Sequence, residues 1–106
     1  MHVVTATGTR KIIRDRIACR TLFTLVCDRI REYQQLYPQL MFVVGGADGW
    51  DEIVAMACIE MNQPYCLVLP NAGYGEYYWR EDHSQEGKDR MSRFLHIQEQ
   101  AWHVEV

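Results

Sequence analysis

The sequence of 106 residues has no long hydrophobic run and no block of basic residues. A membrane-spanning helix needs roughly 20 consecutive apolar residues, and a strand-like pattern begins within two residues of the start, where a signal peptide would lie. The formal net charge is −3, whereas a nucleic-acid surface usually carries a cationic stripe. We therefore expect a cytoplasmic protein with no membrane span and no nucleic-acid partner.

Cysteine and histidine patterns also lack the spacing of known chemical sites. No Cys-x-x-Cys pair occurs, and the four histidines show no metal-ligand spacing with the four cysteines. Each cysteine lies within an apolar helix or strand pattern, which is typical of a buried, reduced thiol. We therefore expect no metal ion and no cofactor. The cysteines are Cys19, Cys27, Cys58 and Cys66.

The composition that is present suits a globular domain, with 48% hydrophobic and 24% charged residues. The length is enough for one hydrophobic core, and no repeat, linker or low-complexity segment divides the chain. Residues 1–106 are therefore expected to form a single domain.

Strand-like and helical patterns alternate along this domain. β-prone apolar runs predict strands at about 1–6, 40–44, 65–69 and 102–106. Apolar spacing of three or four residues predicts helices at about 15–36, 50–61 and 89–100, and 81–88 is expected to be a polar connection. This alternation predicts parallel strands joined by right-handed crossovers. The expected fold is an α/β, minimal Rossmann-like three-layer sandwich with four parallel strands in the order 3-2-1-4 and three helices.

Two glycines end the second expected strand, and a helical pattern begins directly after them. Glycine lets the backbone bend and lets a ligand approach, and the N–H groups of a new helix can receive an anion. In open parallel sheets, ligands bind beyond the carboxyl ends of the strands. The turn is therefore either the centre of a ligand site or an ordinary strand-to-helix turn capped by Asp48. The segment is Phe42-Val43-Val44-Gly45-Gly46-Ala47-Asp48-Gly49-Trp50-Asp51-Glu52.

Three segments together resemble the SLOG superfamily, the Rossmann-like group that includes DprA/SMF proteins and LOG phosphoribohydrolases. Residues 4–10 (VTATGTR) resemble its opening strand and TGTR turn, and residues 45–51 (GGADGWD) resemble its GGAxGxD turn. Pro70, Gly75-Glu76 and Tyr78-Trp79 resemble the loop after its third strand, best known in short phage and plasmid members. The resemblance covers about the first 80 residues. The PGGxGTxxE loop of LOG-type members, which grips phosphate and supplies a catalytic glutamate, is not present.

The resemblance implies a site for a nucleotide or a nucleotide-derived small molecule, in a phage or signalling context. Arg10 would grip a phosphate or carboxylate, or would instead pair at the surface with Asp48 or Asp51. Asp51 would bind ribose hydroxyls, or would instead hold backbone N–H groups at the helix start. Aromatic residues would stack on a base, or Tyr78 and Trp79 would instead pack the loop onto the body with Tyr74 merely exposed. The expected ligand contacts are Thr7, Gly8, Thr9, Arg10, Gly45, Gly46, Ala47, Asp48, Gly49, Trp50, Asp51, Pro70, Tyr74 and Trp79.

Two other functions remain open at this point. One is nucleotide N-glycosidase activity, with Asp51 or Glu76 as the catalytic carboxylate. The other is an interaction protein that keeps the fold and has lost the pocket. Because the strand expected at 102–106 would leave an exposed apolar edge beside the first strand, we also expect a homodimer that buries this strand or the helix at 89–100.

Overall fold

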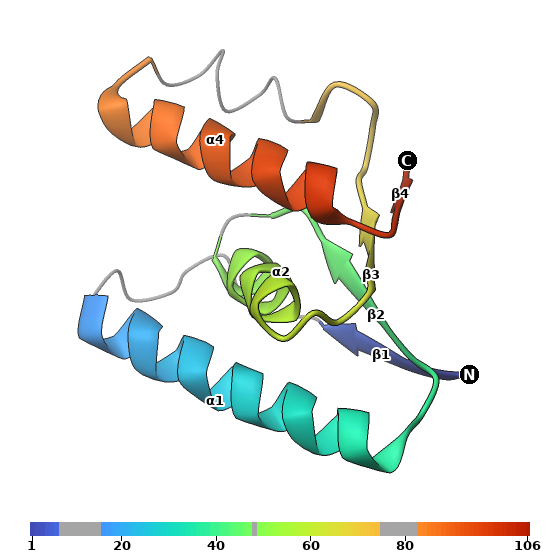
Figure 1. Cartoon of the computed structure of the whole chain (residues 1–106). Coiled ribbons are helices and arrows are strands. Elements are labelled where there is room, and N and C mark those ends of the chain that lie inside the picture. The colour runs from blue at the N-terminus through green and yellow to red at the C-terminus, as the bar shows by residue number, and fades with distance from the viewer. Residues whose placement is uncertain (7–15, 48, 75–82) are drawn as a thin grey trace.

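The computed structural model describes residues 1–6, 16–47, 49–74 and 83–106, which form alternating strands and helices (Figure 1). The strands are β1 (His2–Ala6), β2 (Leu40–Gly45), β3 (Tyr65–Val68) and β4 (His103–Glu105). The helices are α1 (Arg16–Leu36), α2 (Trp50–Glu60) and α4 (Gln85–Gln100). The predicted α/β class, with four parallel strands and three helices, is confirmed in this part of the chain. None of these helices is both long enough and apolar enough to cross a bilayer.

The strand order differs from the prediction. The sheet runs β1-β2-β3-β4 with every neighbouring pair parallel, so the expected order 3-2-1-4 is wrong. Both orders contain the unit β1-β2-β3 and differ only in where the last crossover leaves β4. In the structure β4 pairs with β3, so that Cys66 lies beside His103, instead of returning to the far side of β1.

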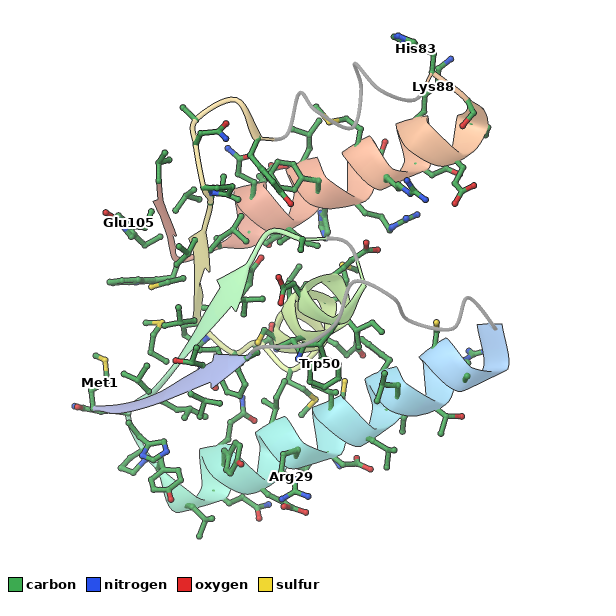
Figure 2. All side chains as sticks on the ribbon, turned by 180° about the vertical axis from the view of Figure 1, so that it is seen from behind. Met1, Arg29, Trp50, His83, Lys88 and Glu105 are labelled. Carbon is green, nitrogen blue, oxygen red and sulfur yellow. The ribbon has the colours of Figure 1, made fainter. Side chains whose placement is uncertain are left out.

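The layers differ for the same reason. Right-handed crossovers that all advance in one direction place their helices on one face of the sheet, and α1, α2 and α4 share one face (Figures 1 and 2). Side-chain burial alternates accordingly: Val44 and Leu67 are fully buried toward the helices, whereas Val3 and Val68 on the opposite face are 52% and 41% exposed. The described chain therefore has two layers, and the predicted three-layer sandwich is wrong.

The core lies between the sheet and the helix layer. Tyr65 on β3 is buried, and its hydroxyl donates a hydrogen bond to the backbone carbonyl of Ile97 on α4. Helix α4 buries Phe94 and Ile97, whereas Leu95 is 50% exposed. The remaining buried hydrophobic residues are Cys27, Ile30, Phe42, Val44, Val54, Ala55, Ala57, Cys58, Leu67 and Leu69.

Helix α4 begins earlier than its apolar spacing predicts. Ser84 is the N-cap, and its hydroxyl accepts a hydrogen bond from the Gly87 N–H at 3.2 Å. In the next turn the Gln85 amide donates to Asp89, and Arg90 pairs with Glu86 at 3.0 Å. These polar interactions form a helical turn from residues that carry no apolar stripe, which is why residues 85–88 were expected to be a connection.

The cysteines are free thiols, as expected. Cys27 and Cys58 are buried in the core, which confirms the prediction for these two. Cys19 and Cys66 are only partly buried, and Cys66 lies on the face of the sheet opposite to the three described helices.

Candidate functional site

The glycine-rich turn lies at the carboxyl end of β2, where α2 begins. Gly49 is the N-cap residue of α2, with φ 93° and ψ −121°, a conformation that a residue with a Cβ rarely adopts. Gly49 thus occupies the cap position that one interpretation gave to Asp48. Asp48 itself lies outside the described residues.

The carboxylate of Asp51 folds back onto this turn. Its Oδ2 accepts a hydrogen bond from the Ala47 N–H at 3.3 Å. A Cβ added to Gly45 would lie 2.6 Å from the same oxygen, so Gly45 leaves room for the carboxylate. Asp51 also lies in the first turn of α2, where a negative charge is favourable. Of the two roles considered for Asp51, binding ribose hydroxyls or holding backbone N–H groups, the structure shows the second.

Gly46 is enclosed by side chains from two other segments. A Cβ at this position would lie 2.5 Å from Leu69 Cδ2 and 3.3 Å from the rings of Phe94 and Tyr74. The Tyr74 and Phe94 rings contact each other at a tilt, with centroids 5.9 Å apart. Glycine at position 46 thus admits protein neighbours. Tyr74 packs against the core, so the expectation that it is merely exposed is wrong; the expected packing of Tyr78 and Trp79 falls outside the described residues.

A small pocket opens between the turn, α2 and α4. Its walls include Gly45, Asp51 and Glu52 on one side and Arg90 and Phe94 on the other, and it has room for about one water molecule. Its charged groups have protein partners too, because Arg93 binds Glu52 and Arg90 pairs with Glu86. Ala47, Gly46, Ala55 and Ile97 complete the lining.

The α4 residues of this pocket were absent from the expected site. Arg90 and Phe94 are 39 and more positions beyond Asp51 in the sequence, and the apolar spacing around Phe94 indicates only a helix. Arg90 lies in a polar stretch whose pattern shows nothing about the pocket. The signal that could have found it is the Ser84 cap, because the cap places the start of α4 and, with it, the turn that carries Arg90.

The other expected residues lie elsewhere. Trp50 does not line this pocket; it lies between α2 and α1 (Figure 2), against a second groove. Pro70 is exposed after β3. The expected contacts of Thr7, Gly8, Thr9, Arg10, Asp48, Glu76 and Trp79 fall outside the described residues. Among the residues that the structure describes, no cluster of three His, Cys, Asp or Glu side chains could hold a metal ion.

Comparison with known proteins identifies no relative. No protein-family model matches the chain, and neither a curated protein nor a solved structure is significantly similar to it.

The backbone role of Asp51 is testable by mutation. Asp51→Ala removes the acceptor for Ala47 and the favourable charge at the start of α2, so we expect the free energy of unfolding to fall by about 1–2 kcal/mol. Asp51→Asn keeps an acceptor oxygen of the same size and is expected to recover at least half of the loss. Urea unfolding monitored by circular dichroism measures both. Equal stability of Asp51→Ala and the wild type would contradict the assignment.

Proposed function

We propose that the chain binds a nucleotide or nucleotide-derived small molecule at the carboxyl edge of its parallel sheet. The observation that carries the proposal is the pocket where the glycine turn after β2, the start of α2 and Arg90 of α4 meet. Ligands of open parallel sheets bind at this edge. The SLOG resemblance of residues 45–51 supports the same location.

The charges around the pocket suit a ligand with both anionic and hydroxyl groups. Ala47 holds the Asp51 carboxylate, and Arg93 compensates the charge of Glu52. Arg90 lines the pocket from the opposite wall, and a guanidinium there suits one oxygen pair of a phosphate or carboxylate. The acidic wall suits ribose hydroxyls, which donate hydrogen bonds.

The size of the pocket limits how such a ligand would bind. With room for about one water molecule, the pocket can accept one polar group of a nucleotide, and the base and sugar would lie over the edge outside it. Tyr74 is occupied by its contact with Phe94, so we do not assign it to base stacking. N-glycosidase activity is not part of the proposal, because the Asp51 carboxylate holds its own turn and Glu76, the other candidate carboxylate, lies outside the described residues.

Ligand-induced thermal shifts test this proposal. We expect one member of a panel of nucleoside monophosphates, ADP-ribose and cyclic dinucleotides to raise the melting temperature, since a ligand at 100 times its Kd adds about 2.7 kcal/mol of stability. Arg90→Ala should reduce the shift at least severalfold. The matched control is Arg31→Ala, an exposed α1 arginine paired with Asp28, which should keep the full shift.

Two outcomes would count against the proposal. No shift from any panel member at millimolar concentration would favour the interaction protein that has lost its pocket. A shift that Arg90→Ala leaves unchanged would place the bound ligand at another site. Gly46 is unsuitable for this test, because its substitution alters core packing before any ligand contact.

A further inference from the structure

The two edges of the sheet differ in how they are protected from pairing with other strands. Edge strands are usually kept from pairing by short length, charge or proline. β4 has three residues and carries Glu105, which pairs with His103 at 2.7 Å. β1 has five residues, His-Val-Val-Thr-Ala. None of them is an aspartate, glutamate, lysine, arginine or proline. β1 is therefore the unprotected edge.

Unpaired backbone groups lie along the outer side of β1. The His2 N–H donates to the Gln39 carbonyl just before β2. Because backbone groups of a strand alternate between its two sides, residues 2, 4 and 6 direct theirs to β2, and Val3 and Thr5 direct theirs outward. Within the described residues β1 pairs with β2 alone.

A groove runs beside this edge, between β1 and α1. Apolar side chains from both elements line it, among them Val4, Val26 and Leu25, and Trp50 and Val54 of α2 are also part of its wall. Its volume is about 380 Å³, many times the roughly 30 Å³ of a water molecule. Leu25 is 59% exposed. We call the groove and the outer side of β1 together the β1 groove. The other residues that line it are Thr5, Ala6, Leu22, Arg29, Ile30, Tyr33 and Phe42.

We propose that the β1 groove is the interface of a two-fold homodimer in which the β1 strands of two copies pair antiparallel. A two-fold axis at Val4 sets Val3 of each copy opposite Thr5 of the other, which are the two residues with outward backbone groups. Each such pair exchanges two hydrogen bonds, so the two pairs satisfy all four outward groups of each strand. The pairing is isologous, so it closes at two copies.

Charge permits a second copy as the occupant, and the available area limits how tightly it binds. Arg29 lies near Glu32 and Arg31 near Asp28, so these two arginines are partly neutralised within their own copy and repel those of the second copy less. β1 is about 17 Å long and α1 about 31 Å long, and a strip about 15 Å wide along them offers on the order of 400 Å² per copy. This is below the roughly 800 Å² of a standard interface, so we expect a dimer that dissociates at tens of micromolar.

This interface replaces the one expected from the sequence. The predicted homodimer buries the C-terminal strand or the helix at 89–100, on the assumption that the fourth strand lies beside the first. In the structure that strand is the short, charged edge β4, and the apolar, unprotected edge is β1.

Sedimentation velocity between 5 and 500 μM tests the proposal. The wild type should shift from monomer to dimer over this range. Leu25→Lys places a charge in the groove at an exposed position, and Thr5→Pro removes an outward N–H while leaving the β1–β2 ladder intact. Each should weaken dimerisation at least tenfold. The control Leu95→Lys changes an equally exposed leucine on α4 and should leave the dimer unchanged.

The outcomes separate the interface from folding and from other contacts. Circular dichroism of each variant reports the fold, and if Thr5→Pro unfolds, Leu25→Lys decides alone. A wild type that is monomeric at 500 μM overturns the proposal. So does a dimer that survives Leu25→Lys, or one that Leu95→Lys abolishes.

Discussion

Gly46→Ala is expected to lower the free energy of unfolding by about 1–3 kcal/mol, the range for overpacking a well-filled core. The new methyl group would lie 2.5 Å from Leu69 Cδ2 and 3.3 Å from the Phe94 and Tyr74 rings, so at least one of these side chains must move. For a domain of this length the melting temperature should fall by roughly 5–15 °C. Thermal and urea unfolding measure the effect.

Gly73→Ala is the matched control for this substitution. Among the described residues its added Cβ would meet only Asn71 Oδ1, at 3.7 Å, so we expect a change within about 0.5 kcal/mol. The double variant Gly46→Ala, Leu69→Ala should be less destabilised than the sum of the single variants, because Leu69→Ala removes the atom that the methyl group meets. Additive losses would show that the contact with Leu69 is not the cause.

Alkaline pH is expected to destabilise the fold through its buried thiol and phenol. Burial, followed by the nearby Cys27, raises the pKa of Cys58 from 9.0 to about 12. Burial, followed by Cys58, also raises the pKa of Tyr65. Each group is neutral in the folded chain at pH values where it loses its proton in the unfolded chain, so unfolding releases protons and stability falls as pH rises.

The pH window follows from these values. The contribution of Cys58 is fully present below pH 9 and is lost between pH 9 and about 12, with a slope of up to about 1.4 kcal/mol per pH unit. Urea unfolding at pH 8, 9 and 10 should therefore show progressively lower stability. Cys58→Ala should flatten this dependence.

A second core variant controls for the loss of packing. Val54→Ala shortens another buried α2 side chain without removing a titrating group, so it should lower stability at every pH and keep the wild-type slope. If Cys58→Ala keeps that slope as well, the thiol does not cause the alkaline loss.

The local sequence determined the kind and rough position of most elements. Strand and helix patterns are set by the direction in which successive side chains point, so the apolar runs around Phe42 and Leu67 and the helix that follows Gly49 could be read from neighbouring residues. The start of α4 was missed because the Ser84 cap and the pairs that follow it are polar. The polar residues 84–90 therefore specify where α4 starts, although they do so through capping and side-chain pairs and not through an apolar pattern.

The sequence also indicated that the turn at residues 45–51 is special, but not why. Gly45 leaves room for the Asp51 carboxylate, and Gly46 leaves room for Leu69, Phe94 and Tyr74. The first contact is local, and a backbone-holding role for Asp51 was among the expectations. The contacts of Gly46 join the turn to residues that are 23 or more positions away in the sequence. No spacing rule predicts which of those residues will lie beside the turn.

Tertiary structure alone decided the strand order, the number of layers and the exposed edge. The alternation of strands and helices is equally compatible with β4 beside β1 or beside β3, because a right-handed crossover can place a strand on either side of the sheet already formed. That choice depends on long-range packing of α4 against α2 and the sheet. It places all three described helices on one face, brings Arg90 to the pocket, and leaves β1 and β4 as the two edges of the sheet, of which β1 is the longer.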